Sequence, residues 1–538
     1  MRLRWPRRGL NEATSFTEQP PESTPSLQNV LAFDPRSGRN RGGSRSGLSK
    51  YCPEQINSSP VQNINHISDA VGVEAVLLES GNDLYLEDDT PLLLEESASV
   101  DVGDRKTILV GVAGGTAKVI TSDGTNDITS GTGTLSSTQS VIFSTPFGGD
   151  LYYTDSYVYR VYYPSTNIIT TWSASLGALP SEAVDGESRT ASLIVTWGGR
   201  IVLSGLISDS QNWFMSAVDD PMDFDYSPST TTISQAVAGN NAPAGLVGDR
   251  ITALIPYTDD VLIFGGDSTI WRLRGNPAED GRIDRVSDIT GIAFGQAWCK
   301  SPEGIVYFFG SRGGVYKLDP NGGVPSRLTA NSIDERLADI NLNDNQVSLV
   351  WDDRHIGVRV IITPRAIDGE VQEEATHFFW DVRNEAWYII RHANKYHNAL
   401  AVHLFDGPDP NDRAVLVGTQ DGWILKFDPD AYSDDGYPIE SYVLLGPLED
   451  VTIAEIRATL ASTSGNVQWS IHTDDDLQSA IDADAATGGE LASGKNPSQW
   501  PKHHIDSGFV KLASTSPWAL ESLILTVEPD TEQRSRIF

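Results

Sequence analysis

A strand–glycine turn–strand phrase recurs along this chain and constrains its fold more than any other feature. It reads VLIFGGDSTIWRLRG at 261–275, IVYFFGSRGGVYKLD at 305–319 and AVLVGTQDGWILKFD at 414–428. An apolar strand, a turn with glycine and a second strand with an early aromatic residue predict a β-hairpin. Because one hairpin cannot bury its apolar face alone, hairpins repeated at intervals of tens of residues predict a β-propeller.

The spacing of the phrases agrees with propeller blades, which run to about 40–50 residues each. Gly265 and Gly310 are 45 residues apart, and Gly310 and Gly418 are 108 apart, which leaves room for two units. Two further hairpin patterns lie inside that interval, at 347–364 and 377–390. The predicted class is therefore all-β, with a propeller-like core.

The chain of 538 residues is too long for one compact core, and its composition changes twice. Residues 1–60 are rich in Pro, Gly, Ser and Arg and predict an extended basic N-terminal arm. Residues 61–436 hold the repeated hairpins of the propeller-like platform. Residues 437–538 predict a small C-terminal antiparallel β-domain resembling a sandwich. One short helix is expected at 332–341, with Ser332 as its N-cap.

Charge is distributed unevenly between the arm and the body. The net charge is −34, yet residues 1–50 carry nine Lys/Arg and four acids, a net of +5. The other residues carry thirty Lys/Arg and 69 acids, a net of −39. Such a body repels nucleic acid, so the basic arm needs a separate explanation.

No motif in the chain predicts catalysis. The two cysteines, Cys52 and Cys299, have no metal or redox spacing and are expected to be reduced and buried. The glycine-rich stretch at 111–120 lacks the spacing of a phosphate-binding loop. For the acidic stretch at 472–486, a solvated loop is favoured over a cation site. We expect no catalytic residue, cofactor or metal, and hence no enzyme; nor does any apolar run reach the length of a membrane span.

The basic residues of the arm have two interpretations. As an arginine-rich segment they would contact nucleic acid, with Phe33 and Tyr51 alongside. As a docking arm they would pair with carboxylates of a neighbouring acidic body, which fits better because this protein itself supplies acidic surface. The predicted partner-binding residues are Arg36, Arg39, Arg41, Arg45 and Lys50.

Several stretches together resemble a known family. They are NVLAFDPRSGRNRGGSRSGLSKY at 29–51, WGGRIVLSG at 197–205, SQNWFMSAVDDPMDFDY at 210–226 and the segment at 251–275. In this order they resemble the tail tubular, or nozzle, proteins of short-tailed bacteriophages, and the C-terminal stretch is similar in style. The chain is shorter than the larger members of that family, so insertion domains seen there are expected to be missing.

The resemblance implies a virion structural protein. In that family six copies form a ring below the portal and its adaptor, and the ring conducts and helps to retain the genome. The implied partners are copies of the chain itself, the head–tail adaptor and portal, tail fibres or spikes, and DNA only in passage through the lumen. The implied location is the virion tail, assembled in the host cytoplasm. The alternative is a propeller-type glycan-binding or glycan-cleaving virion protein similar to a tail spike.

Overall fold

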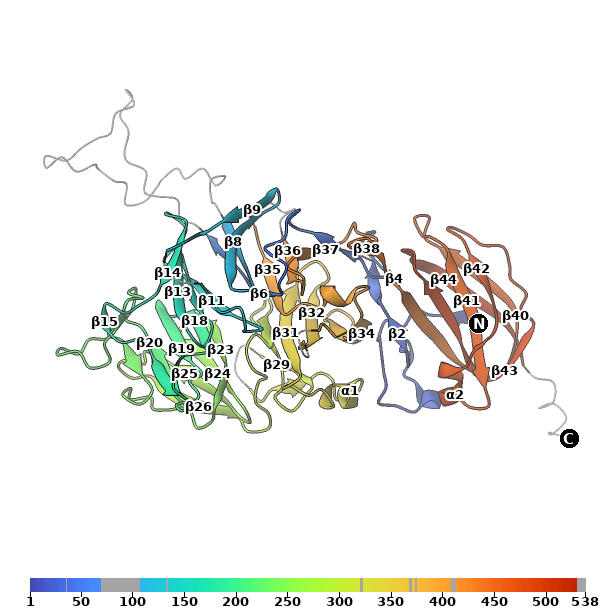
Figure 1. Ribbon diagram of the computed structural model, residues 1–538. Coiled ribbons are helices and arrows are strands. Elements are labelled where there is room, and N and C mark those ends of the chain that lie inside the picture. The colour runs from blue at the N-terminus through green and yellow to red at the C-terminus, as the bar shows by residue number, and fades with distance from the viewer. Residues whose placement is uncertain are drawn as a thin grey trace, which may run out of the picture.

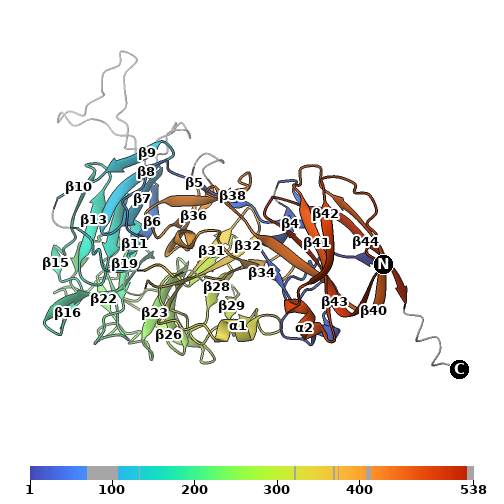
Figure 2. The same cartoon turned by 45° about the vertical axis from the view of Figure 1, so that its right-hand side comes forward.

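The computed structural model is an elongated all-β molecule. Strands hold 51% of its residues and helices 4%, as the sequence predicted. A propeller forms one end and a second β-domain the other, with the N-terminal strands between them (Figures 1 and 2). The structure describes residues 1–34, 36–68, 107–131, 134–319, 323–366, 370–372, 375–407 and 413–529.

Seven antiparallel four-stranded blades make up the propeller, and the strands of blades 1 to 6 follow in chain order. Blade 1 contains β6 (Val61–Ser68), β7 (Thr107–Ala113), β8 (Thr116–Thr121) and β9 (Gly124–Asp127). Blade 2 contains β11 (Phe143–Phe147), β12 (Asp150–Thr154), β13 (Tyr159–Tyr163) and β14 (Ile168–Thr171), with β10 (Thr129–Ser130) added in parallel at its edge. Blade 3 contains β18 (Leu193–Trp197), β19 (Arg200–Ser204), β20 (Trp213–Met215) and β22 (Val237–Ala238).

The remaining blades repeat the pattern. Blade 4 contains β23 (Ile251–Thr258), β24 (Val261–Gly266), β25 (Ile270–Arg274) and β26 (Arg282–Ser287). Blade 5 contains β27 (Trp298–Lys300), β28 (Val306–Phe309), β29 (Val315–Leu318) and β30 (Ser326–Arg327). Blade 6 contains β31 (Asn345–Asp352), β32 (Gly357–Pro364), β33 (His377–Asp381) and β34 (Ala386–Ile390). Blade 7 contains β35 (Ala401–Phe405), β36 (Ala414–Gly418), β37 (Ile424–Asp428) and, from the N-terminal segment, β5 (Gly47–Lys50).

The first strand of each blade faces the propeller axis. Neighbouring inner strands contact one another, namely β6 with β11, β11 with β18, β18 with β23, β27 with β31 and β31 with β35, and β35 of blade 7 contacts β6 of blade 1. Between blades 4 and 5 the contact includes a hydrogen bond of 2.6 Å from Lys300 Nζ to the carbonyl oxygen of Tyr257. The ring is therefore closed.

The repeated sequence phrase occupies one place in the blade. Its three copies form the hairpins β24–β25, β28–β29 and β36–β37, which are the second and third strands of blades 4, 5 and 7. Gly422 in the last hairpin has a φ of +89° and lies against the backbone of Asn57, where a Cβ would collide. Glycine is therefore required in this turn for two reasons: the positive φ and the close approach of the Asn57 backbone.

Blade 7 is completed from the start of the chain. Strand β5 pairs antiparallel with β37, and Leu48 lies opposite Phe427. The strand β38 (Ser433–Asp434), which pairs with β39 (Tyr437–Pro438), then follows β5 in the same sheet. The propeller therefore holds its last blade to the N-terminal segment through backbone hydrogen bonds.

The second β-domain is built around one long strand. Its own strands are β40 (Ser441–Leu460), β41 (Val467–Asp474), β42 (Ala485–Leu491), β43 (His503–Ser514) and β44 (Leu520–Pro529). The first part of β40 pairs with β43 and its later part with β44, with a register shift between Leu445 and Leu448. Two N-terminal strands, β1 (Arg2–Leu3) and β2 (Leu27–Gln28), join this domain by pairing with β44 and β40.

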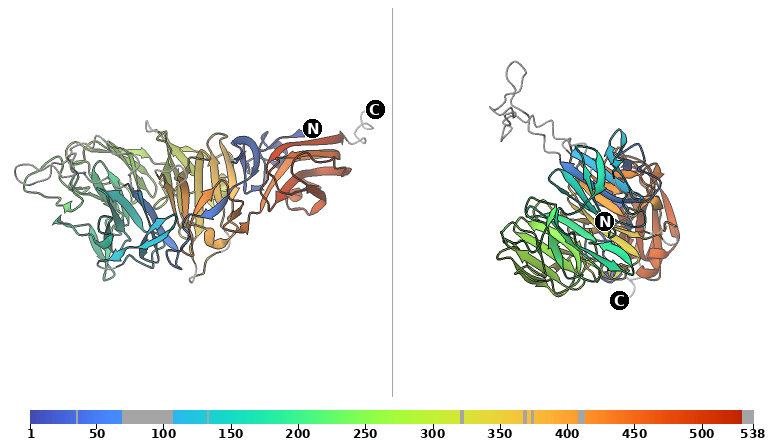
Figure 3. Two further views of the ribbon diagram at one scale, coloured as in Figure 1. Left: turned by 90° about the horizontal axis from the view of Figure 1, so that it is seen from above. Right: turned by 60° about the vertical axis from the view of Figure 1, so that its left-hand side comes forward.

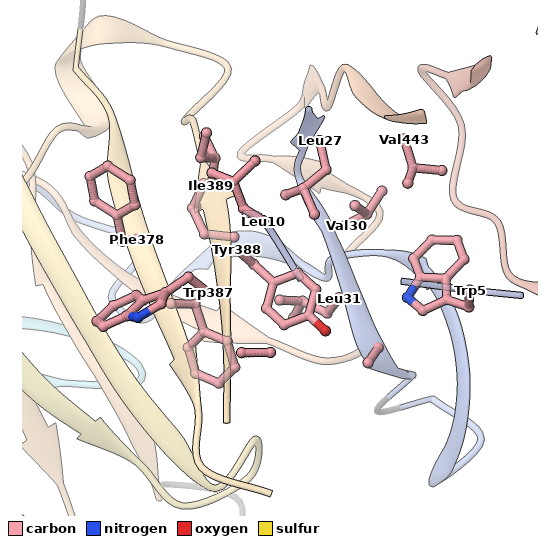
Figure 4. Close-up of a cluster of buried hydrophobic side chains, with 14 of the residues drawn as sticks. Trp5, Leu10, Leu27, Val30, Leu31, Phe378, Trp387, Tyr388, Ile389 and Val443 are labelled. Carbon is pink, nitrogen blue, oxygen red and sulfur yellow. The ribbon is translucent and has the colours of Figure 1, made fainter. Parts of the chain in front are cut away.

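Residues 1–50, here called the N-terminal segment, run between the two bodies and pack against both. The hairpin β3 (Val30–Asp34) and β4 (Arg39–Ser44) lies in this segment. The backbone N–H of Leu10 donates to the carbonyl of Trp387, and that of Asn29 to the carbonyl of Ile389, both on the outer strand β34. Apolar side chains fill the joint between the bodies, as Figure 4 shows: Trp5, Leu10, Leu27, Val30, Leu31, Trp387 and Val443.

Short elements connect the larger ones. The helix α1 (Asp334–Ala338) lies between blades 5 and 6, as predicted, but its N-cap is Ile333 and no side chain caps it. The Ser332 hydroxyl donates instead to the carbonyl of Thr329, so the predicted capping role is wrong. The other short elements are η1 (Phe16–Glu18), η3 (Lys395–His397), α2 (Leu477–Asp482), β15 (Leu176–Gly177), β21 (Asp223–Phe224), β16 (Ser181–Val184) and β17 (Glu187–Thr190).

Candidate functional site: the basic N-terminal segment

Arg45 lies in the buried joint just before β5. Its guanidinium forms a bidentate ion pair with Asp434, with N–O distances of 2.6 and 2.9 Å. The two side chains are 2% and 0% exposed. Three further N–H groups donate to Asn29 Oδ1 and to the carbonyls of Ser46 and Arg391, each at 2.9 Å. All five donors of the guanidinium are therefore used, which is what burial of an arginine requires.

Arg41 is held by two acids. Its Nε and Nη2 donate to Asp34 Oδ2 at 2.8 and 2.6 Å, and its Nη1 donates to Glu521. Asp34 belongs to the same hairpin, whereas Glu521 lies on β44 of the second domain. These carboxylates raise the pKa of Arg41 above its ordinary value although burial acts against it. The ion pairs thus fix the β3–β4 hairpin to the second domain.

Arg36 and Lys50 rest on aromatic rings of the same chain. The Arg36 guanidinium lies 4.6 Å from the ring centre of Tyr432, and burial lowers its pKa. The Lys50 ammonium lies 3.7 Å from the ring centre of Trp423 and 3.6 Å from a carboxylate oxygen of Asp435. Both contacts attach the segment to blade 7 and the residues that follow it, by cation–π attraction.

The five predicted partner-binding residues therefore differ in their surroundings. Arg36, Arg41, Arg45 and Lys50 contact aromatic rings, acids or carbonyls of their own chain, so the expected pairing with acids takes place at least partly inside one molecule. Arg39 is exposed on β4 and forms no ion pair within the described part of the chain. The reason is the fold: the segment buries its own Leu and Trp side chains and brings the arginines with them.

Arg39 lies on the wall of a groove of about 690 Å³. It is lined by the first residues of the chain, the strand β4 and the start of β44. We call this the arginine groove; its lining comprises Arg2, Leu3, Arg4, Trp5, Arg7, Arg39, Asn40, Arg41 and residues 520–523. A basic groove on a chain with a net charge of −34 is the clearest candidate for recognition of an acidic partner.

A cluster of histidines beside Arg45 escaped the sequence analysis. The rings of His377 and His392 lie 4.6 Å apart, and His397 is buried near them. The His377 Nδ1 accepts from the N–H of Ile362, while its Nε2 lies 3.1 Å from Asn398 Oδ1. Burial lowers the pKa of His377 to about 4. The available signal was that four of the nine histidines fall within 377–403.

Other predicted features have structural roles. In the acidic stretch at 472–486, Asp476 caps α2 by accepting from the backbone N–H and the hydroxyl of Ser479. Cys52 and Cys299 are both free and buried. Among the described residues, no group of three or more His, Cys, Asp or Glu side chains is placed to hold a metal ion. The helices within the described ranges are all too short or too polar to cross a membrane.

Comparison with known proteins adds little to this geometry. No family model and no curated protein matches the sequence. Among solved structures, the extracellular domain of BT4673 from B. thetaiotaomicron is 11% identical with a TM-score of 0.41, over 89% of this chain and 63% of that one, so this chain spans less than two thirds of it. BBS1N in complex with ARL6DN is 10% identical with a TM-score of 0.36, over 72% of this chain and 99% of that one. YCF48 bound to D1 peptide is 10% identical with a TM-score of 0.35, over 71% and 99%. The assignment as a seven-bladed propeller therefore depends on the sheet topology.

Proposed function

We propose that this protein is a non-enzymatic structural component of a bacteriophage tail. In this proposal it forms a ring of six copies, a nozzle or tubular protein, below the portal and adaptor, and the ring conducts and helps to retain the DNA. Its partners are its own copies, the adaptor and portal complex, and tail fibres or spikes, with DNA in passage only. It is assembled in the host cytoplasm and resides in the virion tail.

The observation that carries the proposal is the placement of the family-like phrase at 210–226. Trp213 and Met215 on β20 are wholly buried, and so is Phe224 on β21. The turn between them accepts a hydrogen bond of 3.1 Å from the indole N–H of Trp172 to the carbonyl of Pro221. Residues 210–226 therefore form part of the junction between blades 2 and 3. The resemblance to the family thus lies in residues that hold two blades together.

The other resembling stretches occupy connected parts of the same molecule. Residues 29–51 run from the joint between the two bodies into blade 7, and residues 251–275 form the first three strands of blade 4. A resemblance that keeps its order across the N-terminal segment and two neighbouring blades supports a common architecture. It is therefore better support than one short motif would be.

Shape and charge are compatible with a conduit. The two bodies lie on opposite sides of the shared N-terminal segment and make the subunit elongated (Figure 3), which suits a subunit that contacts neighbours at more than one level. The body outside residues 1–50 carries a net charge of −39. If part of this charge faces the lumen, DNA in passage would be repelled from the wall.

Negative-stain electron microscopy of the purified protein, alone and with the head–tail connector of the same source, tests the proposal. The expected result is annular particles with six-fold averages and an open centre. Monodisperse single propellers in both samples would contradict it. The control is a charge reversal outside the arginine groove. It is Arg312→Glu, at an exposed residue on the turn before β29.

A further inference from the structure

The arginine groove carries more positive charge than its own acids neutralise. Arg41 is paired with Asp34 and Glu521. Glu22 lies 3.0 Å from Arg4 and 3.9 Å from Arg7, so one carboxylate serves two guanidiniums. Arg2 and Arg39 are exposed, and neither has an ion pair with any residue that the structure describes. Five guanidiniums thus face three carboxylates.

The groove presents charge at its surface, and the apolar side chains that border it are buried, each exposed by 7% or less. Leu3 and Trp5 line it from the N-terminal segment, and Leu520 and Leu523 from β44. The edge of the Trp5 ring packs on Trp518, with ring centres 5.7 Å apart. Arginines prefer planar oxyanions, which they bind in a bidentate manner. The fitting ligand is a polypeptide that carries closely spaced carboxylates.

This chain contains a segment of that composition. Residues 69–106 connect β6 to β7 of blade 1 and hold eleven Asp or Glu but only two basic residues, Arg105 and Lys106. Its centre reads DLYLEDDTPLLLEE at 83–96, with acids interleaved among leucines. The segment lies outside the described residues, and its two attachment points, Ser68 and Thr107, belong to the propeller.

We propose that the arginine groove of one subunit binds the acidic segment 69–106 of a second copy. This inference rests on the proposed ring and names its contact. Blade 1 and the groove lie on different bodies of the subunit (Figures 1 and 2), so the contact joins two different surfaces and generates a head-to-tail ring. Because the subunits repel each other elsewhere, one complementary site selects the register between them.

A polypeptide fits this groove better than nucleic acid does. A nucleic acid carries its charge over a long track, and beyond the groove it would meet the body, whose net charge is −39. A peptide needs only a local match, because charges more than about 8 Å apart are largely screened at physiological ionic strength. Nucleic acid therefore enters as an outcome of the test.

The test uses a fluorescent peptide of residues 81–97 and the full-length protein, at physiological ionic strength. We expect saturable binding by anisotropy that Arg39→Glu or Arg2→Glu weakens about tenfold or more. The control Arg312→Glu, on a distant exposed turn, should change the affinity less than about twofold. A peptide with Asn and Gln in place of its acids should not bind.

Three results would overturn the inference. They are no saturable binding, equal weakening by Arg312→Glu, or tighter binding of a thymidine oligonucleotide of equal charge. Thermal unfolding of Arg39→Glu and of the milder Arg39→Gln checks whether the variants remain folded. Electron microscopy separates this inference from the ring itself: rings that form equally well with Arg39→Glu reject the groove contact and leave the proposed function standing. Absence of any ring despite peptide binding rejects the proposed function.

Discussion

The Arg45 guanidinium and the Asp434 carboxylate face each other in the plane of a bidentate ion pair, with both side chains almost wholly enclosed by protein. They join the link between β4 and β5 to the strand β38, which follows blade 7. Asp434 also accepts from the backbone N–H of Ala393, on the link between blades 6 and 7. One ion pair therefore connects the N-terminal segment to both ends of the last blade.

Removal of Arg45 should destabilise the protein strongly. Arg45→Ala leaves Asp434 buried without its counter-charge, which costs about 3–5 kcal/mol in free energy of unfolding. Arg39→Ala, in the same segment but exposed, should change it by less than about 0.5 kcal/mol. Urea unfolding measures both. Equal stabilities of the two variants would show that the buried ion pair contributes nothing beyond a surface arginine.

Gly42 is needed for the contact between β4 and Trp5. Its φ is +79°, and a Cβ there would overlap the indole ring of Trp5. Gly38 has a similar φ of +64° but open space around it. Gly38→Ala should therefore lower the free energy of unfolding by about 1–2 kcal/mol, the cost of a left-handed backbone at a residue with a Cβ. Gly42→Ala should lower it by about 1–3 kcal/mol more, because the added Cβ also overpacks against Trp5.

Thermal unfolding of the two glycine variants separates the terms. If Gly42→Ala melts at the same temperature as Gly38→Ala, the packing of Trp5 on β4 does not limit stability.

Acid should destabilise the protein in part through His377. Burial lowers the pKa of His377 from 6.5 to about 4, so the unfolded chain takes up a proton that the folded chain does not. The contribution of neutral His377 to stability is fully present at a pH above its pKa of 6.5 in the unfolded chain. It is lost as the pH falls from 6.5 towards the folded pKa of about 4. The loss for this one group is at most about 1.4 kcal/mol per pH unit. Urea titrations across this range should show a shallower pH dependence for His377→Gln than for the wild type.

The exposed His504 provides the matched control for this measurement. His504→Gln should change the slope less than His377→Gln does, because His504 is exposed on β43 and lies outside the buried histidine cluster. A slope unchanged in His377→Gln would mean that this buried ring does not set the acid sensitivity.

Both thiols should be unreactive in the folded protein. Burial raises the pKa of Cys52 and of Cys299, so neither forms the nucleophilic thiolate at neutral pH. A chromogenic disulfide reagent should detect no thiol in the native protein and two after denaturation in guanidinium. Rapid reaction of one native equivalent would contradict this, and Cys52→Ser would identify the reactive residue.

The hairpins were predictable because their signal is local. Phe264 and Trp271 are paired across a turn of a few residues, and the apolar and glycine positions around them suffice to indicate it. The outer strand of blade 7 was not predictable in this way. Leu48 pairs with Phe427, and nothing in either stretch alone specifies a partner so distant in sequence.

The N-terminal segment shows the limit of compositional reasoning. Its glycines and arginines are not typical of a regular helix or a central strand, and this indicated an extended arm that docks on a neighbouring acidic body. In the structure Gly43 and Gly47 permit close backbone approaches, to Trp518 and Ser433, and Arg45 is buried because Asp434 and three other acceptors are assembled around it. Burial of an arginine depends on acceptors far along the chain, which composition does not reveal.

The pairing of β5 with β37 and of β1 with β44 orders events during synthesis. The ribosome releases the first strands long before their partners exist, since β37 ends at Asp428 and β44 at Pro529. The nascent chain must therefore carry β5 unpaired until β37 completes the propeller, and β1 unpaired until β44 completes the second domain. A premature stop before β37 would leave β1, β2 and β5 without their partner strands, and one between β37 and β44 would leave β1 without its partner, so such fragments should be targets for proteolysis or aggregation.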